Sequence, residues 1–390
     1  MRILVLDANQ RSALAVTRSL GAVHATVLTA DESPQALAGC SRYSSLYLQC
    51  PSPANQPRQF LAWLRDTVTA QRIDWVFPVT EISSQLILLE SQALGAARIP
   101  FATLDQVMAL ADKWQLMQLA QKAGVPHPRT VYFANAAALR PETIDALTYP
   151  VVLKPCQSRR WLGDAWLSTA VHIANSATEL TALLRDARYL RDYPFMLQEF
   201  IPGHGAGVFA LYNRGKPVTF FAHQRLREKP PRGGVSVLSQ SAPLDRNLLD
   251  AAKTLLDAAE WHGVAMVEFR VTAAGDPYLM EVNTRFWGSL QLAIDSGVDF
   301  PALLLKTCLG EAVEPVRDYR VGQRLRWLLG DVDSLYLVLR DPVFSRQQKL
   351  RRLFDFFTPH FGNTRHEVNR WGDLGPAWFE LRAWLRALVG

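Results

Sequence analysis

The stretch MEVNTRFWGS, Met280 to Ser289, places a carboxylate, an amide and a guanidinium on alternate positions next to apolar residues. Alternate side chains of a β-strand point to the same face. Glu281, Asn283 and Arg285 are therefore predicted to share one face of a strand. The preceding apolar segment GVAMVEFRV carries one acidic residue, Glu268. If the two segments pair, three oxygen donors converge.

Two carboxylates and an amide oxygen suit a hard divalent cation. Ionised carboxylates are costly to bury without a partner, and Mg²⁺ is usually held by such oxygen donors together with waters and phosphate oxygens. The alternative is a buried ionic network in which Glu268 and Glu281 pair with Arg270 and Arg285. Both interpretations stay open on these residues alone.

Two lysines upstream favour the metal interpretation. Lys154 ends the apolar segment YPVVLKP, where an ammonium leaving a strand is well placed to contact a phosphate. Lys113 lies inside TLDQVMALADKWQLMQLAQKAGVPHPRT, which is expected to be helical and to end at Gly124 and Pro126. By itself, Lys113 is more typical of a solvated helix residue.

Length and composition describe a folded protein of two or three domains. The chain has 390 residues, of which 49% are hydrophobic and 20% are charged. It has no apolar run of membrane-spanning length and its start is unlike a signal peptide, so we expect a cytoplasmic protein without a transmembrane segment. The four cysteines form no CxxC pair, and the net charge of +6 is spread evenly, which argues against a thiolate zinc site and against nucleic-acid binding.

The first hundred residues alternate strand and helix. RILVLDA, HATVLTA and DWVFPVTE are predicted strands with helices between them, which indicates a Rossmann-like parallel sheet, although a GxGxxG fingerprint is missing. Ligands of such sheets bind at the carboxyl ends of strands. That position draws attention to Asn9, Ser12, Thr80 and Glu81, for which helix capping by Asn9, Ser12 or Thr80 is an equal alternative.

Five motifs together resemble one known family. DKWQLMQLAQKAGVPHP, YPVVLKP, LQEFIPG, VEFRV and MEVNTRFWGS occur in the order and approximate spacing of the ATP-grasp superfamily. Over about residues 1–310 the chain resembles carboxylate–amine ligases of the carbamoyl-phosphate-synthase large-chain-like type.

This resemblance implies an α/β plus α+β fold class. A Rossmann-like parallel α/β domain would be followed by a two-lobed ATP-grasp fold and a helical C-terminal tail. The expected domains are 1–104 (Rossmann-like), 105–190 (smaller lobe), 191–310 (larger lobe with the metal site) and 311–390 (mostly helical extension).

The resemblance also implies a nucleotide site for ATP. Lys113 and Lys154 would hold the phosphates. The segment LQEFIPG would be the hinge, where the backbone of Glu199 and Ile201 reads the adenine edge and Gln198 lies nearby. Its proline makes this segment rigid.

The remaining motif residues would serve the chemistry. Glu268, Glu281 and Asn283 would hold one or two Mg²⁺ ions, with Mn²⁺ as an alternative, at the β- and γ-phosphates. Arg285 would stabilise charge on the transferred phosphoryl group. The implied activity joins a small-molecule carboxylate to an amine through an acyl phosphate and releases ADP and phosphate. An ATP-binding sensor or scaffold and a small-molecule kinase are the alternatives; a homodimer is also expected.

Two segments depart from the family pattern. The loop CQSRRWLGDAWLST is usually rich in glycine but has only Gly163. Its Ser158, Arg159 and Arg160 would contact phosphate or an anionic substrate, or else form a basic surface turn. After the hinge, GHGAGVF offers His204 and glycines where a carboxylate commonly holds the ribose, so ribose binding has no predicted residue.

A basic segment follows in FFAHQRLREKPPRGGVSVLSQSAP. Its Pro-Pro and Gly-Gly pairs predict a flexible loop too long for a tight hairpin. Arg225 and Arg227 are predicted to contact substrate as this loop closes, with Arg232 as a weaker candidate. A solvated basic loop is the alternative.

Two amphipathic stretches, RQQKLRRLFDFF and PAWFELRAWLRALVG, dominate the tail. We expect helices that pack their Trp, Leu and Phe side chains on the rest of the protein or on a second subunit. The alternative is a basic amphipathic helix on an anionic membrane, with Arg351 and Arg352 toward the headgroups.

Overall fold

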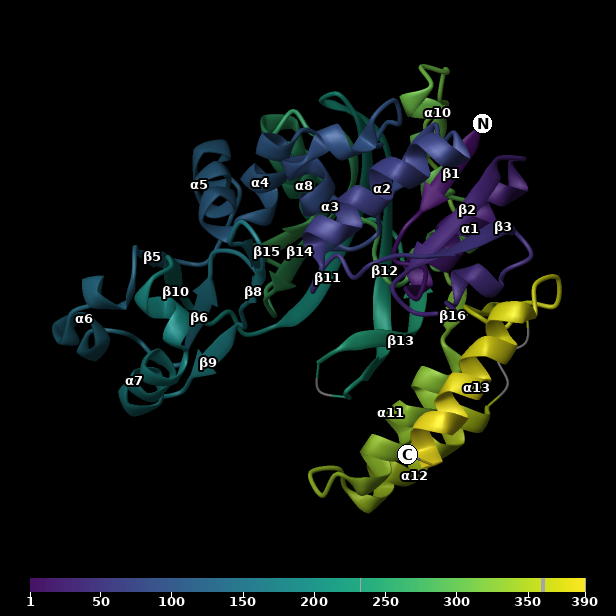
Figure 1. The fold of residues 1–390 in the computed structure, drawn as a ribbon. Helices are drawn as coiled ribbons and strands as arrows, with labels where there is room; N and C mark the ends of the chain where they lie inside the picture. Colours follow the sequence, from purple (N-terminus) through teal and green to yellow (C-terminus); the bar gives the residue numbers. More distant parts are fainter. Residues whose placement is uncertain (232, 359–361, 390) are drawn as a thin grey trace. The chain divides into compact units, whose positions relative to one another are not determined.

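The computed structural model describes residues 1–231, 233–358 and 362–389. The chain forms two compact units, each assembled from segments that are distant in sequence (Figure 1). Unit 1 comprises Met1–Phe101, Val218–Leu244 and Arg285–Gly390, and unit 2 comprises Ala102–Pro217 and Asp245–Thr284. The division into four domains stays a prediction.

Unit 1 begins with a parallel sheet in the order β3-β2-β1-β4. Its strands are β1 (Arg2–Val5), β2 (Thr26–Asp31), β3 (Ser44–Gln49) and β4 (Trp75–Phe77). Its helices are α1 (Arg11–Ala22), α2 (Pro57–Gln71) and α3 (Glu81–Leu89). The predicted Rossmann-like layout is confirmed. β3 was not predicted, because its residues are mostly exposed or half-buried and show no apolar alternation.

Asp7 organises the carboxyl end of this sheet. It has a φ of 58°, and its buried carboxylate accepts hydrogen bonds from the backbone N–H groups of Val79 (3.0 Å) and Thr80 (2.9 Å). Burial raises the pKa of Asp7, and these hydrogen bonds oppose that rise. Thr80 caps α3, as one interpretation predicted, by accepting from the N–H of Ser83. Capping by Asn9 is wrong.

The first helix lies where the sequence predicts one, but neither Asn9 nor Ser12 caps it. Its N-cap is Gln10, without a side-chain hydrogen bond. The amide of Asn9 instead donates to Asp31 and Ser33, each at 2.9 Å, and Ser12 is buried inside the first turn of α1. The side chain of Asn9 therefore links the ends of β1 and β2.

The rest of unit 1 combines strands with the tail helices. The remaining strands are β12 (Lys216–Lys229), which starts at the end of unit 2, β13 (Val235–Ser241), β16 (Arg324–Arg326) and β17 (Thr364–His366). β13 pairs antiparallel with β12 and β16, and β17 is parallel to β16. The helices are α9 (Leu290–Ser296), α10 (Phe300–Cys308), α11 (Leu328–Arg340), α12 (Arg346–Phe357) and α13 (Gly375–Val389). The tail is helical as predicted, and it also contributes two strands.

A buried ion pair fastens the tail to the first helix. The Nε of Arg18 donates to the Asp373 carboxylate at 2.8 Å, and its Nη1 donates to the carbonyl of Glu367 at 2.8 Å. The same carboxylate accepts from the Ser41 hydroxyl and from the N–H of Arg42. Because three of these four contacts converge on the buried Asp373 carboxylate, the end of the chain is integrated into unit 1.

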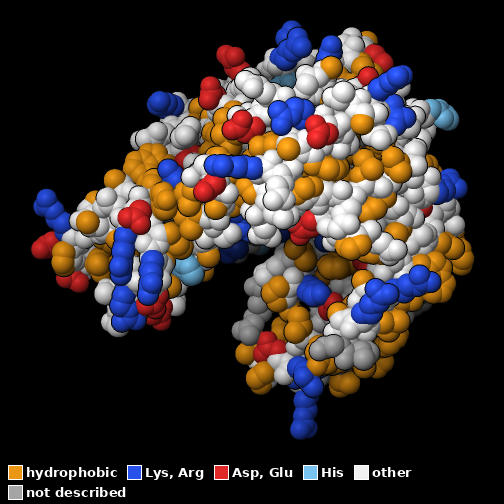
Figure 2. Space-filling view, viewed as in Figure 1, with side chains coloured by type: hydrophobic (Ala, Val, Ile, Leu, Met, Phe, Trp, Pro, Cys, Tyr) orange, Lys and Arg blue, Asp and Glu red, His pale blue; other side chains and the backbone are white. Residues whose placement is uncertain are grey.

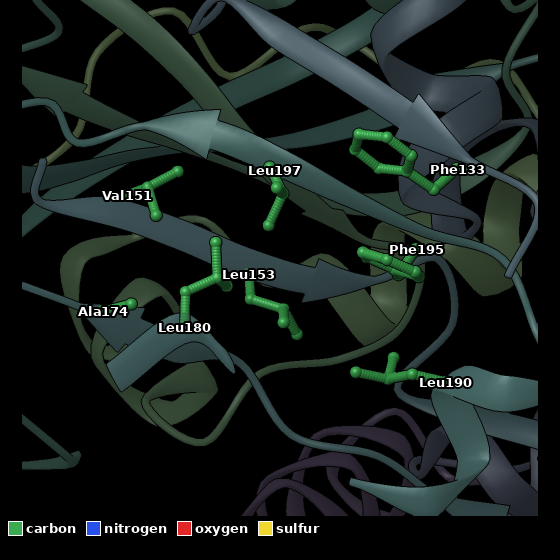
Figure 3. Packing of buried hydrophobic residues seen from close by; sticks show 8 residues of the cluster. All are labelled: Phe133, Val151, Leu153, Ala174, Leu180, Leu190, Phe195 and Leu197. Carbon is green, nitrogen blue, oxygen red and sulfur yellow. The ribbon is translucent and has the colours of Figure 1, made fainter. Parts of the chain in front are cut away.

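Unit 2 contains an antiparallel sheet in the order β5-β10-β6-β9. The strands are β5 (Thr130–Phe133), β6 (Val151–Pro155), β9 (His172–Ala174) and β10 (Phe195–Glu199); β7 (Arg159–Trp161) and β8 (Trp166–Ser168) pair separately. The helices α6 (Pro141–Asp145) and α7 (Ala177–Asp186) complete this part. Its core, which includes the stacked rings of Phe133 and Phe195, is shown in Figure 3.

The other strands of unit 2 carry the predicted carboxylates. β14 (Gly263–Val271) pairs antiparallel with β11 (His204–Asn213) and with β15 (Pro277–Asn283). After β11 the chain turns through Arg214 and Gly215, both with positive φ, as a tight hairpin turn of the predicted sequence requires. The helices are α4 (Leu104–Ala111), α5 (Lys113–Ala123) and α8 (Arg246–Ala258).

The helical stretch predicted from Thr103 is interrupted. Asp112 has extended backbone angles, φ −78° and ψ 113°, which separate α4 from α5. Its carboxylate accepts from the N–H groups of Trp114 (3.0 Å) and Gln115 (3.2 Å) and so caps α5. Lys113 is therefore the first residue of a helix and not a residue inside one.

We expect Asp373→Ala to lower the free energy of unfolding by ~3–5 kcal/mol, because it leaves the buried Arg18 guanidinium without its carboxylate. Urea unfolding followed by tryptophan fluorescence measures the change. Asp186→Ala is the matched control, since Asp186 pairs with Arg185 on the surface, and it should leave the unfolding curve unchanged. Equal curves for Asp373→Ala and wild type would contradict the role of this ion pair.

Candidate functional site

Lys113 is buried at the start of α5. Its ammonium donates to the Ser158 hydroxyl at 2.9 Å and lies 3.8 Å from a carboxylate oxygen of Glu281. The expectation that Lys113 is a solvated helix residue is wrong, because the break at Asp112 turns its side chain toward β15. The two predicted motifs that hold Lys113 and Glu281 are thus in contact within unit 2.

Lys154 is the second buried cation of this cluster. It lies on β6 opposite Met196, and its Nζ is 3.9 Å from the Met280 sulfur. Burial lowers the pKa of Lys154 to about 8; the Glu281 carboxylate opposes this shift and the Lys113 ammonium adds to it. Two ammonium groups therefore face one carboxylate, which leaves this point favourable for an anion.

The carboxylates come from neighbouring strands, as predicted. Glu268 lies directly opposite Glu281, and Met266 lies opposite Asn283. The register shifts by one residue after Glu268, so Met280 is the extra residue of a β-bulge. The Nδ2 of Asn283 donates to the Glu268 carboxylate at 3.0 Å. This hydrogen bond fixes the orientation of the Asn283 amide, so its oxygen points away from the Glu268 carboxylate.

The donor set fits a hard divalent cation. The side chain of Glu281 is 41% exposed, although the lysine beside it is buried. Two carboxylates and one amide oxygen are the chemistry that Mg²⁺ prefers. Among the described residues, no group of three or more His, Cys, Asp or Glu side chains could hold a metal. The predicted set has only two such side chains, Glu268 and Glu281, and takes its third donor from the Asn283 amide. Metal binding by these three residues stays a prediction.

The predicted hinge has one unsatisfied polar atom. Gln198 is almost fully buried on β10, where its Nε2 donates to the Thr130 hydroxyl at 2.9 Å. Its Oε1 is buried without a hydrogen-bond partner among the described residues. The N–H of Glu199 donates to the Arg129 carbonyl at 3.0 Å. Backbone recognition at Glu199 would therefore use its carbonyl, and at Ile201 the N–H.

The arginine segment is not a long loop. Arg225 and Arg227 lie on β12, whose pairing with β13 extends to Lys229. The flexible-loop prediction is wrong over these residues, since the connection is confined to the few residues after Lys229. Arg232 lies outside the described residues.

The guanidinium of Arg227 is engaged inside unit 1. It lies 2.7 Å from the fully buried Asp331, which also binds Arg326 (2.7 Å) and Arg352 (2.6 Å). Arg225 is more exposed and lies 3.6 Å from Glu228. Contact with substrate therefore fits Arg225 better than Arg227, and for both it remains a prediction.

Arg285 is the first residue of the last segment of unit 1, two positions after Asn283. Its Nη1 donates to the carbonyl of Phe286 at 3.0 Å. This hydrogen bond does not test the prediction that Arg285 binds a phosphoryl group.

The loop after the lysine strand is a short β7–β8 hairpin. Ser158 contacts Lys113 directly, and the guanidinium of Arg160 stacks over the ring of Tyr193 at 4.7 Å. His204 begins β11 and is exposed. Ribose binding therefore still has no predicted residue.

Some residues of the cluster escaped the sequence analysis. Asp112 was detectable, because an aspartate before a helix is a common N-cap. The approach of Met280 to Lys154 follows from the bulge and had no sequence signal. In unit 1, and not part of this cluster, the buried His223 is hydrogen bonded to Ser289 at 2.8 Å and was also missed; burial lowers its pKa to about 3, so it is neutral.

Comparison with known proteins relates part of this chain to an ATP-grasp family. A family model described as "ATP-grasp in the biosynthetic pathway with Ter operon" matches residues 191–330. The curated N5-carboxyaminoimidazole ribonucleotide synthase of Synechococcus elongatus is 30% identical over 165 residues, which cover 42% of this chain and 39% of that protein. The match thus spans about two fifths of that relative.

Solved structures extend the likeness to the fold. Biotin carboxylase from Campylobacter jejuni superposes with a TM-score of 0.67 and 16% identity, covering 83% of this chain and 74% of that one. An L-amino acid ligase from Bacillus licheniformis gives a TM-score of 0.61 and 18% identity over 80% and 75% of the two chains.

Residues 191–330 thus resemble an ATP-grasp family, and most of the chain shares its fold with these solved structures. The order of motifs recognised in the sequence, the matched family model and the shared fold agree on this point. Lys113 and Lys154, which the resemblance predicts to bind phosphates, are both buried, and their contact with phosphate stays a prediction.

We expect Lys154→Met to raise the free energy of unfolding below pH 8 by ~1–3 kcal/mol, because it removes a buried cation. The folded-state pKa of about 8 lies below the ordinary 10.5, so the native state loses this proton first as the pH rises. Wild-type stability therefore increases relative to the variant between those pH values.

Urea unfolding of both proteins at pH 7 and pH 10 measures this difference, which should shrink at the higher pH. Lys253→Met, at an exposed lysine paired with Asp257, is the control and should show neither effect. A Lys154→Met variant that is less stable than wild type at pH 7 would show that the ammonium is not a destabilising group.

Proposed function

We propose that this chain is an ATP-grasp protein and an ATP-dependent ligase that joins a small-molecule carboxylate to an amine. The γ-phosphoryl group of ATP would pass to the substrate carboxylate, the amine would attack the acyl phosphate, and ADP and phosphate would leave. One observation carries this proposal: Lys113 and Glu281, from separate motifs, meet 3.8 Å apart beside the buried Lys154.

The lysine pair supports binding of a polyphosphate. Two buried ammonium groups repel each other, and this repulsion contributes to the low pKa of Lys154. An anionic phosphate next to them would raise the pKa of Lys154 and stabilise both cations. In this proposal the lysines bind and orient ATP before any bond is broken.

The carboxylate strands support the role of a divalent ion. Bound Mg²⁺ would supply charge neutralisation at the β- and γ-phosphates. Glu268, Glu281 and Asn283 would hold it, with the Asn283–Glu268 hydrogen bond fixing the amide. Because these side chains project from paired strands, their separation is set by backbone hydrogen bonds and not by loop motion.

The hinge offers a place for the base. The orphaned Oε1 of Gln198 is an acceptor that a ligand amino group or an ordered water could satisfy. We infer that adenine lies near Gln198, with the carbonyl of Glu199 and the N–H of Ile201 as backbone contacts. Arg285 and Arg225 are proposed to stabilise charge on the phosphoryl group and on the substrate carboxylate.

Related proteins support the reaction class but differ in substrate. One similar structure is named as an L-amino acid ligase, and the curated relative as a carboxyaminoimidazole ribonucleotide synthase. An amino acid is the substrate class that we propose to test first, in line with the polar carboxyl end of the N-terminal sheet.

We expect release of ADP and phosphate from Mg-ATP only when a suitable acid and amine are both present. Pools of amino acids and small carboxylic acids are the probes. Glu281→Ala and Asn283→Ala should each lower turnover at least ~100-fold, because they remove ligands of the ion that neutralises the phosphates. Glu142→Ala, at an exposed carboxylate elsewhere in unit 2, should behave as wild type.

The products separate this proposal from its alternatives. A stable phosphate ester with no amide would identify a small-molecule kinase. Tight ATP binding without ADP release in any pool would identify a sensor or scaffold. Full turnover in Glu281→Ala would sink the proposed metal site.

A further inference from the structure

Helix α12 exposes bulky apolar side chains, while one of its arginines faces inward. Arg352 points into the protein, where its guanidinium lies 2.6 Å from the fully buried Asp331. Leu350, Phe354 and Phe357 are 56%, 70% and 71% exposed. Their spacing of four and three residues places them on one stripe of the helix.

Packing within unit 1 does not account for this stripe. α12 contacts α11 and is anchored through Arg352, yet none of its twelve residues is buried. Three bulky apolar side chains in water cost free energy that a partner surface would recover. We call Leu350, Phe354 and Phe357 the α12 stripe.

The neighbouring tail helix repeats the pattern. α13 is linked to α11 by the Trp384–Asp333 hydrogen bond of 2.8 Å, and it exposes Trp378, Leu385 and Leu388. Figure 2 shows hydrophobic side chains interspersed with basic ones over the region where Figure 1 draws α11 to α13. We expected these helices to pack their apolar side chains against the rest of the protein, and only some of those side chains do so.

The positive charge of α12 favours an anionic partner. α12 carries Arg346, Lys349, Arg351 and Arg352 against one acidic residue, Asp355. The side chain of Arg351 is 84% exposed, and its only acidic neighbour among the described residues is Asp355, at 4.0 Å. A second copy of the chain on the same face would set these cations against their own equivalents. An anionic partner would instead be attracted.

We propose that the α12 stripe docks on an anionic lipid surface. Leu350, Phe354 and Phe357 would enter the boundary between headgroups and acyl chains, while Arg346 and Arg351 contact the headgroups. The Arg352 side chain, expected from the sequence to face the headgroups, is held by Asp331 instead. In the described part of the chain no helix is long and apolar enough to span a membrane.

This binding mode does not depend on the ligase proposal. It uses residues of the tail that have no part in the Lys113–Glu281 cluster, and vesicle binding reports it without any turnover. A ligase at a lipid surface would meet membrane-associated substrates, but the docking is tested by itself.

The test is cosedimentation of the full chain with phosphatidylcholine vesicles that contain 0 to about 40% phosphatidylserine, at low and high salt. We expect binding that rises with phosphatidylserine and falls with salt, since the attraction to headgroups is screened. Phe354→Gln/Phe357→Gln should lower the partition coefficient about tenfold or more. Arg346→Gln/Arg351→Gln should weaken binding to anionic vesicles specifically.

The matched control is Leu89→Gln/Leu309→Gln, which removes two exposed leucines, one at the end of α3 and one directly after α10, and should bind as wild type. Wild-type protein that stays in the supernatant at every lipid composition overturns the proposal. So does unchanged binding by the phenylalanine variant. Light scattering that shows a wild-type dimer and a monomeric phenylalanine variant would assign the stripe to self-association and would also overturn it. If the phenylalanine variant fails to fold, the arginine variant decides by the same measurement.

Discussion

The antiparallel pairing of β14 with β15 is the constraint on which the candidate site depends. Pairing sets Glu268 opposite Glu281 and brings Asn283 within 3.0 Å of Glu268. The bulge at Met280 then sends the thioether of this residue toward Lys154 as Glu281 reaches Lys113. A shift of one residue in register would turn the carboxylates to the opposite face. The positions of the candidate site's carboxylates are therefore fixed by backbone hydrogen bonds.

Buried carboxylates with several arginine partners organise unit 1 in the same way. Asp331 binds three guanidinium groups, and Asp373 joins Arg18 to the loop at Ser41. Such clusters contribute little net free energy, because desolvation offsets attraction. Their main effect is on geometry, because each guanidinium group is held in one position. They tie the tail to the N-terminal sheet and to β12, and in doing so they turn Arg352 inward and leave the α12 stripe outside.

Elements with strong periodicity were predictable. The β1, β2 and β4 strands, α1 and the β14–β15 pair follow from apolar runs and from alternation that any fold of these segments must satisfy. The short strands β3, β16 and β17 lack that signal, since neighbouring strands and not side-chain patterns define them. The Pro-Pro and Gly-Gly pairs suggested a long loop around Arg225 and Arg227, but pairing with β13 extends the strand past both residues. Local turn signals were outweighed by long-range hydrogen bonds.

The amino-acid sequence by itself determined the motif order, the resemblance to the ATP-grasp superfamily and the shared face of Glu281 and Asn283, because residue type and spacing along one strand are local properties. Only the tertiary structure decided that Lys113 is buried against Glu281, that Arg227 is held by Asp331 and that α12 presents its phenylalanines to solvent. Each of these depends on which distant segment lies next to the residue. A side chain's charge state and exposure follow from such neighbours, and sequence spacing does not specify them.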